Sequence, residues 1–258
     1  MINHTFPANI LDKNSLNTEL QSSNQEQKGI LESSLYLSLP LQSKISAPQT
    51  WLVFIAAMFL VSVPVFIEAP LVRSLPTLSL AITGFWVWLS ITLMSRPHTH
   101  LWGDLLQGFS WSWLAGSIYW GWLRWEPAWH LPIESIGLPY ALWCLTRNWG
   151  KVGNWFYLGS LFGTVLTDIY FYLADLMPYW RQIMNADTVG ASQILQNALT
   201  QVQTTWGQVW AITLALVLMI VGVLSLVNKQ RHWYAFGGAV LSTILVDSLF
   251  LLAAIVAH

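Results

Sequence analysis

The stretch WGWLRWEPAWHLPIES, residues 120–135, places polar groups among four tryptophans within an otherwise apolar part of the chain. Its polar members are Arg124, Glu126, His130 and Glu134. A guanidinium group can hold a phosphate or carboxylate, and imidazole and carboxyl groups can accept and donate protons. These residue types suit anion binding or proton transfer, provided that the fold brings them together.

A second polar set follows helical spacing within an apolar segment. Thr164, Asp168, Tyr172 and Asp175 recur every three or four residues and therefore lie close to one helix face. Charges in a membrane are costly unless they are paired or hydrated, so we expect this stripe to face the bundle interior or a water-filled cavity. Two interpretations of Asp168 stay open: a proton-linked or substrate-binding acid, and a structural partner of a polar group elsewhere in the bundle.

The charged groups expected on the outer side of the membrane form one candidate set. Its members are Glu68, Arg73, Arg124, Glu126, His130, Glu134, Asp168 and Asp175. Asp247, between Thr243 and Ser248 in the last apolar segment, is a candidate intramembrane acid with the same two interpretations. The catalytic residues stay unknown, because the sequence has no GxSxG elbow, no P-loop and no dinucleotide fingerprint.

Histidine and cysteine placement argues against a metal site. The stretch RPHTHLWGD offers His98, His100 and Asp104, and His232 lies in another loop on the same side. There is no HExxH motif and no repeated histidine box, and the single Cys144 excludes a cysteine-based site or an intramolecular disulfide. We predict no metal and assign these histidines to hydrated loops.

Tryptophan is unusually frequent, with 17 residues in 258. Tryptophan prefers the headgroup region, and those at residues 120–129 fit an outer belt. Trp111 and Trp113 lie deeper, which favours helix packing; the alternative is contact with a flat apolar ring such as a quinone, carotenoid or chlorin. The sequence requires no cofactor, and no histidine stands in the middle of a predicted span as an axial ligand.

The amino-acid composition of this chain is typical of a membrane protein. Hydrophobic residues make up 55% and charged residues only 9%, against about 25% charged in soluble domains. We therefore predict an all-α, polytopic membrane bundle over residues 49–258, preceded by a disordered polar tail over residues 1–48. An amphipathic segment near 188–206 is expected on the outer surface. The net charge of −1 gives no basic footprint for nucleic acid.

About seven transmembrane helices follow from the apolar segments. They are 51–68, 77–95, 104–122, 132–146, 154–176, 209–227 and 234–256. The fourth is doubtful because it is short, carries Glu134 at its start and contains Pro139; the alternatives are a re-entrant segment and a surface helix. Pro139 would kink it as Pro64 would kink the first. Seven crossings put eight lysines and arginines on the N-terminal side and three on the other, whereas omitting the fourth gives five against six. The positive-inside rule therefore favours seven spans with a cytoplasmic N-terminus.

Small residues recur at the spacing that lets membrane helices approach closely. Gly108, Ser112 and Gly116 follow one another at intervals of four in the third segment, and Gly159 and Gly163 form a GxxxG in the fifth. Helix interfaces in membranes are enriched in such residues. We expect both segments to lie inside a compact bundle.

Three stretches carry a family resemblance. They are SVPVFIEAPLVRSLP, LWGDLLQGFSWSWLAGSIYWGWLRWEPAWHLPIESIGLPYALW and GNWFYLGSLFGTVLTDIYFYLADLMPYWRQ. With them the chain resembles, over most of residues 50–255, a family of multi-pass proteins from cyanobacteria classed as a domain of unknown function. The resemblance implies a photosynthetic host and a thylakoid or plasma membrane location. It supplies no catalytic residues.

Three functions stay open at this point. We favour a non-enzymatic protein that supports the assembly, stability or cofactor handling of a membrane complex, with the lipid bilayer and a photosynthetic complex as its partners. The first alternative is a proton-coupled small-molecule transporter that uses the acids of the spans. The second is a membrane enzyme that acts on a lipid or isoprenoid at the outer face through the polar groups of residues 120–135.

Overall fold

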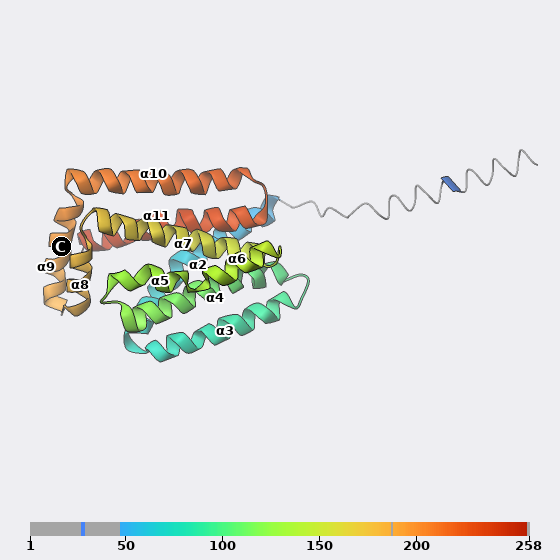
Figure 1. The fold of residues 1–258 in the computed structure, drawn as a ribbon, viewed down its shortest axis with the longest axis horizontal. Coiled ribbons are helices and arrows are strands. Elements are labelled where there is room, and N and C mark those ends of the chain that lie inside the picture. The colour runs from blue at the N-terminus through green and yellow to red at the C-terminus, as the bar shows by residue number, and fades with distance from the viewer. Residues whose placement is uncertain (1–26, 29–46, 187, 257–258) are drawn as a thin grey trace, which may run out of the picture. The chain divides into compact units, whose positions relative to one another are not determined.

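The computed structural model describes residues 27–28, 47–186 and 188–256 (Figure 1). The predicted tail therefore falls almost wholly outside the described residues. Throughout the described part, the regular structure is helical. Its α-helices are α2 Ala47–Ser74, α3 Pro76–Met94, α4 His100–Ile118, α5 His130–Glu134, α6 Leu138–Thr146, α7 Lys151–Leu173, α8 Met177–Asn185, α9 Thr188–Val202, α10 Thr205–Val227 and α11 Arg231–Val256.

Five helices in the described part are long and apolar enough to cross a membrane. Their crossing segments are Gln49–Ser74, Pro76–Met94, Lys151–Leu173, Thr205–Val227 and Arg231–Leu252. They correspond to the first, second, fifth, sixth and seventh predicted spans. The chain is thus consistent with a multi-pass membrane protein, in agreement with its composition.

The third predicted span corresponds to α4, which is the most enclosed helix of the bundle. Ten of its 19 residues are buried. The hydroxyl groups of its buried serines have hydrogen-bond partners inside the protein. In addition, Ser90 of α3 donates a hydrogen bond to the Gly103 carbonyl oxygen at 2.7 Å. Because neighbouring helices meet its polar groups, α4 needs less apolar surface than a lipid-exposed helix.

The fourth predicted span, 132–146, is not one helix. The chain forms α5, then a 3₁₀ turn over Ser135–Gly137, then α6. Pro139 stands in the first turn of α6, where its missing N–H leaves no helical hydrogen bond unmade. The expectation that Pro139 kinks a continuous helix is therefore wrong: this proline helps to start a new one.

Contacts between α4 and α7 show that these two helices run in the same direction. Near their beginnings, the Asp104 carboxylate accepts hydrogen bonds from the backbone N–H groups of Val152 and Gly153, both at 3.0 Å. Asp168, late in α7, meets His130, which follows the end of α4. The intervening residues 119–150 must therefore return along the bundle, through the broken α5–α6 segment.

Helices α2 and α11 share that direction. The Trp51 ring packs on Tyr234, and the Phe66 ring packs on Phe250, so the two helices run in the same direction. Close contact of Gly163 in α7 with Thr243 in α11 joins this pair to α7. The beginnings of α2, α4, α7 and α11 consequently lie at one end of the bundle (Figure 1).

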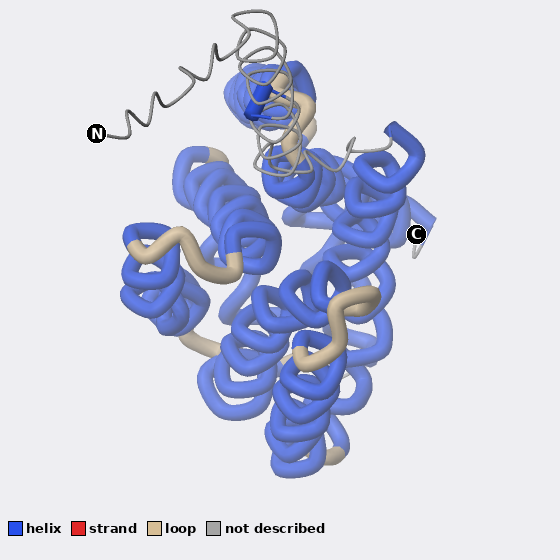
Figure 2. The backbone as a smooth tube through the Cα atoms, turned by 90° about the vertical axis from the view of Figure 1, so that its right-hand side faces the viewer, coloured by secondary structure: helices blue, strands red, loops and turns tan. Residues whose placement is uncertain are grey.

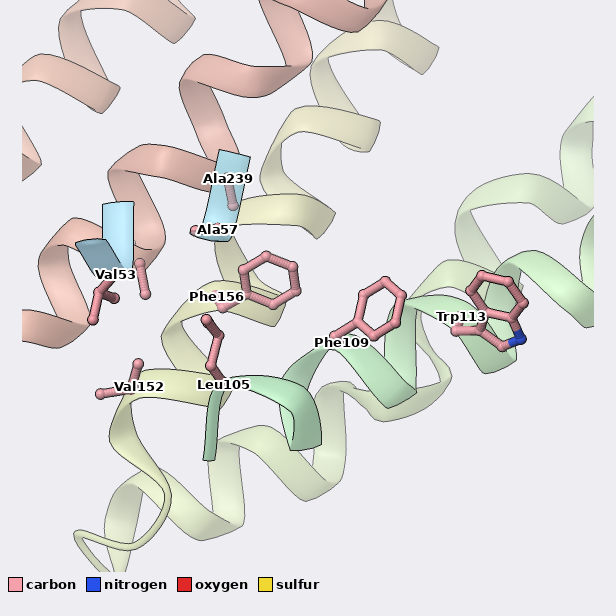
Figure 3. Close-up of a cluster of buried hydrophobic side chains, with 9 residues drawn as sticks. Val53, Ala57, Leu105, Phe109, Trp113, Val152, Phe156 and Ala239 are labelled. Atoms are coloured by element: carbon pink, nitrogen blue, oxygen red, sulfur yellow. The ribbon is translucent and has the colours of Figure 1, made fainter. Parts of the chain in front are cut away.

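The main core lies where these four helices meet (Figure 3). Its buried members are Val53, Ala57, Leu105, Phe109, Trp113, Val152, Phe156, Ala235 and Ala239. Trp113 is 4% exposed, packs against Phe109 and Trp86, and donates a hydrogen bond from Nε1 to the Ser79 carbonyl oxygen at 3.0 Å. Its deep position is explained by helix packing.

Backbone contact between α4 and α7 is unusually close. A Cβ placed on Gly153 would lie 1.9 Å from the Asp104 carbonyl oxygen, and one placed on Gly108 would lie 1.9 Å from the Gly153 carbonyl oxygen. Such an approach requires glycine on both helices. The expected role of the small residues in the third and fifth segments is confirmed at Gly108, Gly159 and Gly163, each of which lies against a neighbouring helix.

Helices α8 and α9 lie across the other end of the bundle (Figure 1). Figure 2 views the bundle from the opposite end and shows its described part as helices joined by loops. Ile194, Leu195 and Leu199 on α9 are partly buried, whereas Gln193 and Asn197 are exposed, so the helix is amphipathic. The bilayer interface is the usual location of such a helix.

Candidate functional site

A buried contact between a histidine and a carboxyl group joins α5 to α7 at the end of the bundle where α8 and α9 lie. His130 Nδ1 is 2.7 Å from Asp168 Oδ1. The two side chains are only 11% and 6% exposed. Because a carboxylate accepts but does not donate, it orients the imidazole with Nδ1–H towards Asp168 and leaves Nε2 as the nitrogen that can take up a further proton.

Nε2 faces a second carboxyl group. Glu134 follows His130 by one helical turn, and its Oε1 is 4.0 Å from Nε2, with its side chain 13% exposed. Tyr157 holds this turn in place: its hydroxyl donates to the Glu134 carbonyl oxygen at 2.6 Å and accepts from the Gly137 N–H at 3.1 Å. The α5 turn is thus anchored to α7 by the contact of His130 with Asp168 and by the Tyr157 hydroxyl group.

A third carboxyl group enters from α2. Glu68 is 9% exposed, its Oε1 accepts a hydrogen bond from Ser117 at 3.0 Å, and the Ser117 hydroxyl is 2.7 Å from that of Ser79. Glu68 and Glu134 lie close enough for their negative charges to repel each other. Gly116 makes room for this carboxyl, since a Cβ there would lie 3.1 Å from both of its oxygens.

Aromatic rings surround these polar groups. After α4 the chain widens into a π-helical turn over Tyr119–Leu123, a local irregularity that is frequent at functional sites. Tyr119 is fully buried, with its ring centroid 4.5 Å from that of His130. Trp120 and Trp180 stack at 5.5 Å with an interplanar angle of 11°, and both contact the imidazole. These rings lower the local dielectric constant and so strengthen electrostatic effects inside the cluster.

The charge balance of this acid–histidine cluster, defined as Glu68, His130, Glu134 and Asp168, is its main chemical property. Two carboxyl groups, those of Glu134 and Asp168, face one imidazole, and the third, Glu68, lies within electrostatic range of Glu134. Among the described residues, no guanidinium or ammonium group forms an ion pair with any of the three. Each unpaired buried ion costs several kcal/mol. The described residues contain no group of histidine, cysteine and carboxyl side chains arranged to hold a metal ion. A carboxyl group and an imidazole can each take up or release a proton, so the arrangement is suited to proton binding.

Three residues of the predicted polar stripe lie outside this cluster. Thr164 donates a hydrogen bond to the Ser160 carbonyl oxygen of its own helix at 3.3 Å. Tyr172, in the last turn of α7, is 60% exposed, and Asp175 follows the end of α7 in a left-handed backbone conformation, with φ of 55° and an exposed side chain. Arg73 is also exposed. The expectation that Tyr172 and Asp175 face the interior with Asp168 is wrong: Tyr172 lies on the exposed side of the last turn, and Asp175 lies beyond the end of α7 at Leu173, where the helical spacing does not continue.

The polar residues of the 120–135 stretch separate into two groups. Arg124 donates to the Trp120 carbonyl oxygen at 3.2 Å and lies 5.7 Å from the Trp125 ring. Glu126 pairs with Arg181 at 2.8 Å on the exposed surface, and this charge-assisted hydrogen bond lowers the pKa of the Glu126 carboxyl group. Neither joins the acid–histidine cluster, so the stretch does not form a single polar pocket.

Asp247 has its own partner. Its Oδ2 accepts a hydrogen bond from Thr167 of α7 at 3.0 Å, which links α7 to α11. This contact agrees with the structural interpretation of Asp247. Asp104, which was considered as a metal ligand, instead caps the beginning of α7.

Sequence reasoning missed the groups that connect Glu68 to the rest of the bundle. Ser79, Ser117 and Tyr119 are fully buried, and Trp180 covers the imidazole from α8. A usable signal was present in α4, where Ser110 and Ser117 are seven residues apart and so lie on one helix face.

The comparisons with known proteins give one result. Residues 57–255 match the family described as "Protein of unknown function (DUF3120)". No curated protein and no solved structure matches the chain.

Proposed function

Since the chain belongs to the DUF3120 family, whose function is unknown, we propose from its geometry that it is a proton-coupled membrane carrier for a small molecule. The observation that carries the proposal is the acid–histidine cluster, in which the His130 imidazole lies between the carboxyl groups of Asp168 and Glu134, with the buried Glu68 within electrostatic range of Glu134. Ionisable groups buried in membrane bundles commonly mark proton relays and substrate pathways.

The proton transfer would run between Glu134 and His130. With Nδ1–H held by Asp168, the free Nε2 accepts a proton and the 4.0 Å separation from Glu134 closes by a small side-chain movement. The resulting imidazolium lies between two carboxylates, which stabilise it. Glu68, within electrostatic range of Glu134, responds to each change in charge and transmits it to α2.

The proposed topology has seven crossings and a cytoplasmic N-terminus. The parallel course of α4 and α7 supports it, because residues 119–150 then return through the bundle although α5 and α6 are separate helices. The acid–histidine cluster would lie at the outer end. The resemblance to cyanobacterial proteins supports a thylakoid or plasma membrane of a photosynthetic host.

Proton flux in proteoliposomes tests this function. Vesicles containing the purified chain and a pH-sensitive dye are exposed to a panel of amino acids, sugars, carboxylates and inorganic anions. We expect at least one compound to change the internal pH with the native chain, and Glu134→Gln and Asp168→Asn to abolish the change. The first replacement removes a proton-binding group, the second removes the negative charge that stabilises the imidazolium, and both retain hydrogen bonding.

Asp175→Asn is the matched control, because this carboxyl group lies near the same end but outside the cluster, and it should leave the flux unchanged. A response that survives in the Glu134 and Asp168 variants would contradict the proposal.

The second candidate is a non-enzymatic support of the assembly, stability or cofactor handling of a photosynthetic membrane complex. The observation that favours it is the enclosure of the cluster: Glu68, His130 and Asp168 are at most 9% exposed, as expected for a latch that holds helices together. Affinity purification in mild detergent separates the two candidates. Stoichiometric retention of a photosynthetic complex, together with impaired complex assembly in the Asp168→Asn strain, would favour support over proton coupling.

A further inference from the structure

A groove opens at the end of the bundle opposite to the acid–histidine cluster. It encloses about 630 Å³, within the range of about 300–1,000 Å³ that is typical of small-molecule sites. It lies between the start of α2, the loop joining α3 to α4, and the starts of α4, α7 and α11. Its lining residues are Gln49, Met94, Ser95, Pro97, His98, His100, Leu101, Asp104, Val152 and Arg231.

The polar lining is rich in donors. Arg231 donates from Nη2 to Gln49 Oε1 at 2.7 Å, and its Nε has no hydrogen-bond partner among the described residues. His98 and His100 are exposed in the same groove. An arginine, two histidines and an amide therefore surround one opening, and a guanidinium group matches the geometry of phosphate oxygens better than an ammonium group does.

Asp104 is the one acidic residue in the lining, and its charge is already engaged. One oxygen accepts from the Val152 N–H and the other from the Gly153 N–H, so the carboxylate neutralises the start of α7. The starts of α2, α4 and α11 carry no acidic residue in their first turns. Their dipoles add positive potential to the groove and reinforce Arg231.

We propose that this groove binds a phosphate-bearing anion, either the headgroup of an anionic lipid or a free phosphate. Arg231 is the principal ligand, and His98 and His100 of the same lining supply additional donors. The groove lies at the end that collects most of the arginines and lysines, so an anionic headgroup in the adjoining leaflet has direct access. This site is separate from the acid–histidine cluster and does not depend on proton coupling.

Thermal unfolding of the full chain tests the groove with two probes. The first is inorganic phosphate, titrated in detergent against chloride at matched ionic strength. The second is phosphatidylglycerol, compared with phosphatidylcholine alone in nanodiscs. We expect at least one probe to stabilise the chain, and Arg231→Gln to weaken its apparent affinity about tenfold or more, as expected when a charge-assisted hydrogen bond is lost.

The control variant is Arg147→Gln, which removes the same charge from an exposed arginine beside Trp143, outside the groove lining. It should bind the probe within twofold of the native chain. His98→Gln with His100→Gln, at two exposed positions, should weaken binding at least threefold without affecting the core. Stabilisation by phosphate assigns a soluble anion, and stabilisation by phosphatidylglycerol alone assigns a lipid headgroup. The proposal is overturned if neither probe stabilises the chain, or if Arg231→Gln and Arg147→Gln behave alike.

Discussion

Replacement of His130 by alanine is expected to lower the free energy of unfolding by about 3 kcal/mol, since it removes the partner of a buried carboxyl group. Asp168 is 6% exposed at its side chain, and His130 is the partner assigned to it by the described contacts. The same change also removes ring contacts with Tyr119, Trp120 and Trp180. Chemical unfolding in mild detergent, followed by tryptophan fluorescence, measures the loss.

A double-mutant cycle separates the ionic contribution from the packing contribution. Asp168→Asn in the His130→Ala background should recover about 1 kcal/mol or more, because it neutralises the carboxyl group left without a partner. The loss of ring packing caused by His130→Ala is the same whether or not Asp168 is replaced, so it cancels when the coupling energy is calculated. A coupling energy below about 0.5 kcal/mol would show that the 2.7 Å contact contributes little to the cluster.

Gly153→Ala should destabilise the bundle by about 3 kcal/mol or more, the upper part of the range for overpacking. The new Cβ would meet the Asp104 carbonyl oxygen at 1.9 Å, and a backbone atom of a packed helix cannot turn aside as a flexible side chain can. Relief requires α4 and α7 to separate, which also disturbs the Asp104 cap of α7. A thermal melt in detergent, with gel filtration to confirm the monodisperse state, measures the effect.

Gly84→Ala is the matched control for this prediction. A Cβ at Gly84 meets no atom within 4 Å, and the residue lies inside α3. Alanine at this position should be neutral or stabilise the helix by up to about 1 kcal/mol, because it restricts the unfolded backbone. Equal melting temperatures for the Gly153 and Gly84 variants would contradict the close approach of α4 and α7.

The lengths of the apolar segments were sufficient to predict most of the long helices. The segments at 51–68, 77–95 and 209–227 each lie within or nearly within one long helix, because a membrane-spanning helix needs a continuous apolar run and the sequence displays it directly. The segment at 132–146 failed as a single helix. Its apolar run contains Gly137 followed by Pro139, and the pair ends one short helix and starts another.

The candidate site was predictable only in part. The helical spacing of α7 singled out Asp168, and it lies on the interior face. That Asp168 meets His130, 38 residues earlier, depends on the return of the chain through α5 and α6, which hydropathy does not encode. The contact of Glu68 with Ser117 likewise joins helices whose neighbourhood is decided by packing. Periodicity identifies a face, whereas the partner of that face is a property of the tertiary structure.

The central claim is that the acid–histidine cluster holds exchangeable protons, and infrared difference spectroscopy tests it most directly. Spectra of the native chain at neutral pH should contain the carbonyl stretch of protonated carboxyl groups, and titration with base should remove it. Subtracting the spectra of Glu68→Gln and Glu134→Gln, one at a time, should assign part of that band to the cluster, whereas Asp175→Asn should leave it unchanged. If the native chain and both cluster variants show the same protonated-carboxyl band, or none, the cluster does not store protons and the proposed proton coupling is wrong.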